Sequence, residues 1–190
     1  MALARNHTLL IVLAVLAALL FWVWTEYNGL ITAKGAVDGS WAQVETQYQR
    51  RMDLVPNLVN TVKGAASFEQ ETLTQVTQAR TNWLSADNRG EQIGAAEDFD
   101  SALARLLVTV ESYPQLQATQ AFRDFMTQLE GTENRISTAR RDFNEAVRSY
   151  NVRTQRFPTN ILAGMFGFDA EQYFDAAEGS EDAPSADFEN

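Results

Sequence analysis

An uncharged run near the N-terminus constrains the fold more than any other feature of this sequence. Residues 9–24 are all apolar, and no charged residue occurs between Thr8 and Thr25. A helix needs about 20 apolar residues to cross a bilayer, with about 17 as the lower limit, so residues 8–26 are just long enough. A cleaved signal peptide is the alternative, but it needs small residues after the apolar run, which here ends in FWVW. We therefore predict an uncleaved transmembrane helix over residues 8–26.

The charges that flank this run predict its orientation. Arg5 precedes the run, Glu26 follows it at once, and the next basic residue is Lys34. Positive residues favour the cytoplasmic side of a membrane. We therefore expect residues 1–7 in the cytoplasm and the remaining chain outside it, in a single-pass protein of the cell (inner) membrane.

The residue inventory excludes most catalytic chemistry. The chain has no cysteine, its one histidine is His7 on the N-terminal flank, and its ten glycines form no phosphate-binding loop. Histidine-based triads and histidine or thiolate metal sites therefore lack their essential groups. A pair of carboxylates could still support hydrolysis, but the sequence offers no sugar cleft or metal shell beside one. We predict no catalytic, cofactor-binding or metal-binding residues, no cofactor, and no enzyme activity.

Acidic residues outnumber basic ones by 25 to 15, which gives a net charge of −10. Six of the acids lie in the last sixteen residues, which contain no base. Such a composition predicts a solvated, disordered tail over residues 175–190. Because the rest of the chain is also acidic, it offers no basic surface for nucleic acid, and we expect none as a partner.

Apolar residues recur at helical spacing beyond residue 26. Two series have a seven-residue period, and a shorter stretch between them has a three-to-four spacing, all of which is typical of helices packed in bundles and coiled coils. The first series is interrupted once, at Glu69, and we expect both series in the core. The first contains Trp41, Tyr48, Val55, Val62, Val76 and Trp83; the second Phe122, Leu129, Ile136, Phe143, Tyr150 and Phe157; the short stretch Ile93, Ala96, Phe99, Leu103, Leu106 and Val110.

The expected helix ends complete the fold prediction. Residues 85–90 predict a loop, and Tyr113-Pro114 ends one helix and starts the next. Pro56 either bends a continuous helix or starts a new one capped by Asp53, and the unbroken phase of the first series favours the bent helix. No alternation is long enough for a strand. We predict an all-α fold: an antiparallel bundle of three to four long helices over residues 27–174, on an N-terminal transmembrane helix.

Several motifs occur in a characteristic order. The most diagnostic is RRMDLVPNLV at residues 50–59, followed by ESYPQL at 111–116 and LEGTENRISTAR at 129–140. Shorter matches are Tyr27-Asn28, Glu71, Ala79-Arg80, Phe143-Asn144, Tyr150-Asn151, Phe157-Pro158, Phe166-Gly-Phe168 and Tyr173-Phe174. Over roughly residues 22–174 the chain resembles the LemA family of bacterial single-pass membrane proteins.

This resemblance implies a helical bundle on an N-terminal anchor and no established enzyme activity. Family members are often encoded beside membrane metalloproteases or TPM-domain proteins, which implies a protein of either kind as a partner. Phe143 stands where the family more often has tyrosine, so a polar network built on that hydroxyl would be altered here.

Charged residues of these motifs fall at core-facing positions. Arg51 lies seven residues after Val44, and Glu133 lies seven after Met126. An ion pair between Arg51 and Glu133 at the helix interface is therefore expected, within a buried polar layer that fixes register. A recognition or catalytic carboxylate is the alternative. The residues of this predicted layer are Arg50, Arg51, Asp53, Glu133, Asn134 and Arg140.

The apolar segment at residues 157–168 follows the last heptads. It either caps the bundle or exposes an apolar patch to another subunit or to lipid. Because the polar helix faces offer little to bury, we predict a homo-oligomer with this C-terminal segment at the interface. The predicted interface residues are Phe157, Ile161, Leu162, Met165, Phe166, Phe168, Tyr173 and Phe174.

The function predicted from the sequence is a non-catalytic, membrane-anchored scaffold that contacts lipid through residues 8–26, self-associates, and organises membrane or partner proteins. The alternative is an extracytoplasmic adaptor or sensor for a membrane protease or another membrane partner.

Overall fold

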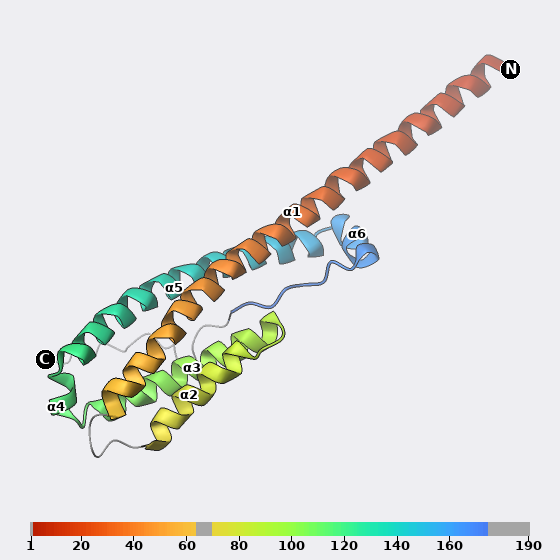
Figure 1. Cartoon of the computed structure of the whole chain (residues 1–190). Helices are drawn as coiled ribbons and strands as arrows, with labels where there is room; N and C mark the ends of the chain where they lie inside the picture. Colours follow the sequence, from red (N-terminus) through yellow and green to blue (C-terminus); the bar gives the residue numbers. More distant parts are fainter. Residues whose placement is uncertain (1, 64–69, 175–190) are drawn as a thin grey trace, which may run out of the picture. The chain divides into compact units, whose positions relative to one another are not determined.

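The computed structural model describes residues 2–63 and 70–174, with side chains described at His7 and from Leu9 onward. This part of the chain contains six helices and no strand, which confirms the all-α prediction (Figure 1). Four helices are long and two are short. They are α1 (Ala2–Lys63), α2 (Gln70–Leu84), α3 (Arg89–Val110), α4 (Pro114–Gln117), α5 (Gln120–Gln155) and α6 (Thr159–Phe166). The predicted acidic tail and the interruption at Glu69 lie outside the described residues.

Helix α1 continues through Pro56, as the unbroken heptad phase predicted. A proline inside a helix removes one backbone hydrogen bond, which here leaves the carbonyl of Met52 without its usual donor. The guanidinium of Arg80 on α2 donates to that carbonyl through Nε at 3.1 Å. A side chain from the next helix therefore replaces the bond that Pro56 removes.

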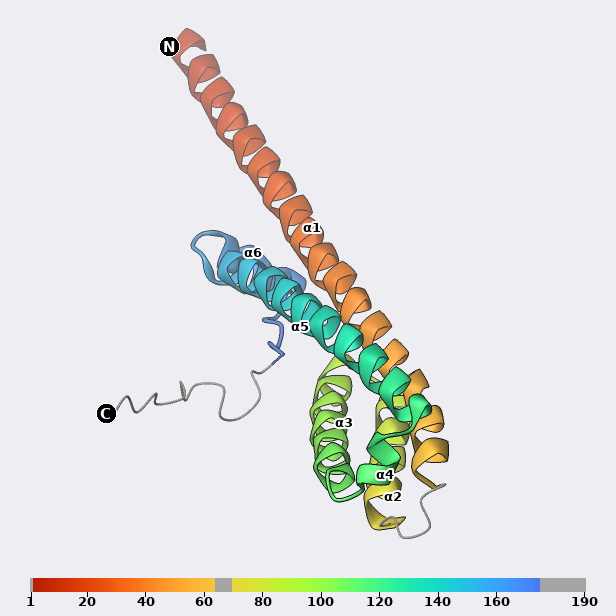
Figure 2. The same cartoon turned by 90° about the vertical axis from the view of Figure 1, so that its left-hand side faces the viewer.

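The chain divides into two compact units. Unit 1 contains α1 up to Ala42 together with Arg141–Tyr173, and unit 2 contains the described residues of Gln43–Arg140 together with Phe174. In unit 2, α2 and α3 lie side by side (Figure 2). The loop between them fixes the start of α3, because the N-cap Asn88 accepts a hydrogen bond from the Glu91 amide while the Glu91 carboxylate accepts one from the Asp87 amide.

The core of unit 1 contains the last buried residues of the second heptad series together with residues of α1. Phe143 and Tyr150 of α5 are buried with Leu30, Val37 and Trp41 of α1. The rings of Trp41 and Phe143 meet edge to face, with centroids 5.1 Å apart. Helix α6 ends at Gly167, whose φ of 72° is the left-handed conformation that glycine adopts without strain.

The heptad series predict the core correctly with one exception. The described members of the first series and those of the second from Phe122 to Tyr150 are buried, as are the residues of the three-to-four stretch. Phe157 was expected in the core and is 77% exposed instead. The reason is that α5 ends at Gln155, so the helical period no longer applies at residue 157.

The apolar start of α1 has no protein packed around it. Its large side chains from Leu9 to Phe21 are 51–70% exposed, and Trp24 is 63% exposed. By length and composition, this is the one described helix that could cross a membrane. Helix α1 runs on without a break from these exposed residues to Leu30 and Val37 in the core of unit 1.

Candidate functional site

A carboxylate at the centre of unit 2 links its charged motif residues. Asp100 on α3 accepts a hydrogen bond from the Tyr48 hydroxyl at 2.8 Å and one from Arg51 Nη1 at 2.5 Å. Tyr48 and Arg51 lie one turn apart on α1, so both reach the same carboxylate. Arg51 is only 3% exposed, which makes it the most deeply buried charge of the group.

Helix α5 completes this cluster with two further charges. Glu133 pairs with Arg51 Nη2, as the heptad positions predicted. Arg140 Nη1 lies 3.6 Å from the second oxygen of Asp100. The Arg140 guanidinium also lies 3.9 Å from the centre of the Phe174 ring. Three helices and the C-terminal segment therefore meet at one charge network, which we call the Asp100 cluster: Tyr48, Arg51, Asp100, Glu133, Arg140 and Phe174.

The environment of Tyr48 keeps its hydroxyl protonated. Its ring stacks between Trp83 at 6.4 Å and Phe174 at 6.0 Å, measured between centroids. Burial, followed by the adjacent Asp100 carboxylate, raises the pKa of Tyr48 above its ordinary value of 10.0. At neutral pH Tyr48 is therefore protonated and donates its hydrogen bond to Asp100.

Half of the residues predicted for the buried polar layer lie outside the Asp100 cluster. Arg51, Glu133 and Arg140 join the Asp100 cluster, whereas Arg50, Asp53 and Asn134 are exposed on the surface. Arg50 and Asp53 instead line a groove of about 490 Å³ between α1 and α5. Their motif positions adjoin Arg51 in sequence, but neighbours on a helix point in different directions. Their placement in a buried layer is therefore corrected.

Asp100, the centre of the cluster, was not among the predicted residues. Its spacing in the sequence indicates a core-facing position, because Asp100 lies seven residues after the buried Ile93 and three before the buried Leu103. That is the same heptad reasoning that identified Arg51. An acidic residue at a core-facing position of α3 was the partner that a buried arginine on α1 required.

The charges of the Asp100 cluster pair with one another. Both oxygens of Asp100 face donors of the same chain, and both terminal nitrogens of Arg51 are paired. No group of three or more residues with metal-ligating side chains occurs among the residues that the structure describes. The geometry is that of a polar lock between helices.

A second cluster lies in unit 1, where α1 leaves its apolar run. The Glu26 carboxylate accepts hydrogen bonds from Arg153 at 3.2 Å and from the Thr159 hydroxyl at 3.3 Å. Gly29 makes room for this pair, because a β-carbon there would overlap the Arg153 guanidinium. The next residue, Tyr27, packs its ring against Phe166 at 5.0 Å and against Phe168 at 5.8 Å. Both ends of α6 are thereby attached to α1.

The segment after α6 is held by an amide clamp. The Asn151 side chain donates to the Glu171 carbonyl and accepts from the Glu171 amide, both at 2.8 Å. Lys34 on α1 pairs with the Glu171 carboxylate. In the sequence Asn151 is marked only as a motif residue and Lys34 has no mark of a structural role, so this clamp was not predicted.

The predicted interface residues separate into two groups. Phe157, Ile161, Met165, Phe166 and Tyr173 are exposed by 39–77%. Leu162 and Phe174 are buried within the chain, so their place at an outer interface is corrected, and Phe168 is half-buried against Tyr27. The segment is therefore an intramolecular cap on one face and an exposed apolar surface on the other.

Comparison with known proteins identifies relatives over most of the chain. The model of the LemA family matches residues 40–188. Magnetosome protein MamQ 2 of Paramagnetospirillum magneticum is 30% identical, over 88% of this chain and 70% of the relative. Magnetosome protein MamQ of Magnetospirillum gryphiswaldense is 28% identical, over 84% and 68%. Protein LemA of Metamycoplasma hominis is 24% identical, over 80% and 69%.

Proposed function

Because this chain belongs to the LemA family, as its motifs predicted, we propose that it is a non-catalytic, membrane-anchored helical scaffold that self-associates and organises membrane or partner proteins. The proposal places one transmembrane pass at residues 8–26, in the cell (inner) membrane. The N-terminus is cytoplasmic, because Arg5 is the basic residue nearest the apolar run.

The continuity of α1 carries this proposal. One helix of 62 residues contains both the exposed apolar run and the core residues Leu30, Val37 and Trp41 of unit 1. No linker separates the two, so unit 1 is fixed to the anchor by a continuous helical backbone. A continuous helix between anchor and folded unit suits a protein that holds partners at a fixed position on a membrane surface. A flexible linker would suit a protein whose domain must reach partners at varying distances.

The pairing of charges within the Asp100 cluster supports a non-catalytic role. Its charges pair with one another within the chain, and Tyr48 donates to Asp100 as a neutral hydroxyl. What unit 2 presents to other molecules is its outer surface.

A groove in unit 2 favours the adaptor alternative. It has a volume of about 670 Å³ and lies between α2 and α3, with Gln75, Gln78 and Asn82 among its lining residues. Amide side chains suit a polar peptide segment better than an apolar one. In this alternative, the occupant is a segment of a membrane metalloprotease or a TPM-domain protein.

The particle size of the full-length protein in mild detergent tests the proposal. Light scattering coupled to size-exclusion chromatography should show one large, discrete assembly, and crosslinking in native membranes should show the same copies in contact. A monomer that co-purifies with a membrane protease would instead establish the adaptor.

A groove variant separates the two functions further. Gln78→Arg places a long cation in the groove between α2 and α3, and Thr138→Arg, at an exposed position of α5, is its matched control. If the adaptor reading holds, only Gln78→Arg should lose the co-purifying protein. If the scaffold reading holds, both variants should keep the assembly size of the wild type.

A further inference from the structure

Large apolar side chains are exposed on one face of α6 and just before the helix begins. Ile161 and Met165 lie four residues apart on α6 and are 55% and 72% exposed, and Phe157, two residues before α6, is 77% exposed. The opposite face is buried through Leu162 and Ala163. Single exposed apolar residues are common on protein surfaces, but a contiguous row marks a contact surface. The question is what covers this row, which we call the α6 row.

The attachment points of α6 show how it lies on α1. Its first residue, Thr159, contacts Glu26, and its last residue, Phe166, contacts Tyr27. An eight-residue helix is about 12 Å long, so a helix that ran along α1 would meet residues about two turns apart. Contacts at consecutive residues mean that α6 crosses α1 (Figure 1).

The length of the apolar run places this crossing at a membrane boundary. A hydrocarbon core of about 30 Å takes about 20 residues of helix. Counted from Leu9, the first residue of the run, the far boundary falls near Asn28. The sixteen apolar residues end four positions earlier, so Tyr27 and the helix packed on it lie at the boundary.

We propose that α6 is an interfacial helix that lies in the plane of the membrane, with the α6 row inserted among lipid headgroups and upper acyl chains. This inference rests on the proposed anchor, because α1 sets both the depth and the orientation of α6. It adds a second lipid contact to a protein whose sequence indicates one.

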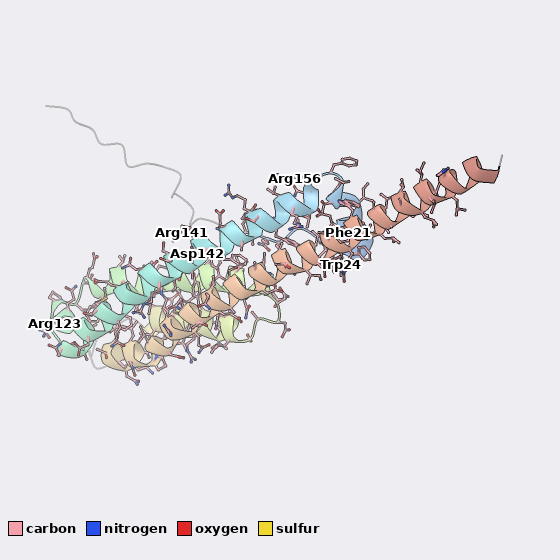
Figure 3. The ribbon with its side chains drawn as sticks, turned by 90° about the horizontal axis from the view of Figure 1, so that it is seen from above. Phe21, Trp24, Arg123, Arg141, Asp142 and Arg156 are labelled. Atoms are coloured by element: carbon pink, nitrogen blue, oxygen red, sulfur yellow. The ribbon has the colours of Figure 1, made fainter. Side chains whose placement is uncertain are left out.

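The charges of unit 1 fit this depth. Glu26 would be an unpaired carboxylate near the hydrocarbon boundary, but Arg153 and Thr159 neutralise and solvate it. Arg156, at the end of unit 1 that carries Phe21 and Trp24, is exposed beside Phe157 (Figure 3). An arginine next to an inserted aromatic ring can reach lipid phosphates while its stem stays in the apolar layer.

Area favours lipid over a second copy of the chain as the occupant. A stable protein interface buries about 800 Å² on each partner. Three side chains and the edge of Phe166 offer only part of that area. Lipid contact has no such threshold, since each inserted side chain adds its own transfer free energy.

The absence of cysteine from the chain allows a direct test. Single variants Met165→Cys and Ile161→Cys, in the full-length protein, carry a nitroxide label in nanodiscs of mixed zwitterionic and anionic phospholipid. Leu20→Cys reports on the anchor, and Val108→Cys, 66% exposed on α3 of unit 2, is the comparison position. Collision with oxygen measures lipid exposure, and collision with a water-soluble nickel chelate measures water exposure.

We expect the ratio of oxygen to nickel collisions at Met165 and Ile161 to be several-fold above that at Val108, as at Leu20. A ratio at both α6 positions equal to that at Val108, with Leu20 still in lipid, overturns this inference and leaves the anchor standing. A water-exposed Leu20 overturns the proposed anchor and this inference with it. Spin–spin broadening at Met165 that disappears on dilution with unlabelled protein identifies a second copy as the occupant, which also overturns it.

Discussion

Removing the carboxylate of Asp100 should destabilise the protein far more than removing that of Glu133. Both pair with Arg51, but the two carboxylates differ in surroundings. Asp100 is 28% exposed and also accepts from Tyr48, whereas Glu133 is 58% exposed and pairs with Arg51 alone among the described contacts. Asp100→Ala therefore leaves a buried guanidinium with one solvated partner and a buried hydroxyl without its acceptor.

The expected magnitudes follow from burial. Loss of one partner of a buried ion pair costs about 3–5 kcal/mol, and we expect Asp100→Ala within this range. The unpaired Tyr48 hydroxyl overlaps with that cost and does not simply add to it. Glu133→Ala removes a mostly exposed charge and leaves the more buried Arg51–Asp100 pair intact, so its cost should be about 1 kcal/mol or less.

Thermal unfolding of the full-length protein in detergent, followed by circular dichroism at the helical band, measures the difference. For a chain of this size, 1 kcal/mol shifts the midpoint by about 2–4 °C, so Asp100→Ala should lower it by about 6–20 °C and Glu133→Ala by no more than about 4 °C. The pair Asp100→Leu with Arg51→Met should recover much of the loss. If Glu133→Ala costs as much as Asp100→Ala, the reasoning from burial is wrong.

Three further outcomes are expected. Above pH 10 the unfolded chain ionises Tyr48 while the folded chain keeps it protonated, so stability should fall by about 1.4 kcal/mol per pH unit for this proton; Tyr48→Phe should flatten the alkaline loss, and an unchanged slope would contradict the raised pKa. Asn151→Ala opens the clamp on Glu171 and should expose the segment at residues 167–174 to chymotrypsin, while exposed Ser149→Ala should leave digestion unchanged. A reporter active only in the cytoplasm and fused after Asn190 should be silent, and full activity would reverse the proposed orientation.

The helices could be predicted from the sequence because their apolar periods are long. Heptad spacing identified the core positions of α1, α2 and α5, and the three-to-four spacing identified those of α3. The heptad period predicted Phe157 in the core wrongly, because periodicity indicates the buried face only within a helix and α5 ends at Gln155. That α1 continues through Pro56 could be predicted from the heptad phase. The hydrogen bond from Arg80 that replaces the one removed by Pro56 could not, because a donor on another helix has no fixed sequence spacing from its acceptor.

The Asp100 cluster could be predicted in part. A core-facing charge such as Arg51 demands a partner, and the register of α5 offered Glu133. The stronger partner, Asp100, lies on the shorter helix, where only apolar residues were followed. Arg50 and Asp53 were included because of their motif, and a motif does not state which of its residues point inward.

Contacts of the C-terminal segment depended on tertiary structure. Asn151 binds a backbone twenty residues away, and Lys34 reaches Glu171 from another helix. Neither contact follows a helical or strand period, so neither could be predicted from the spacing of residues in the sequence. The apolar segment after α5 was recognised, but its division into a packed face and the α6 row required the position of Tyr27.

The residues by which this chain resembles its family have structural roles in the cases where the structure shows their contacts. In the run at residues 50–59, Arg51 holds the Asp100 cluster and Pro56 frees the carbonyl that Arg80, another motif residue, binds. Asn151 and Phe174 fix the segment after α6. Motif residues used in this way hold neighbouring segments of the chain together within each unit. In the function proposed here, partner choice would therefore depend on outer surfaces, such as the groove between α2 and α3, where residues can change without loss of the fold.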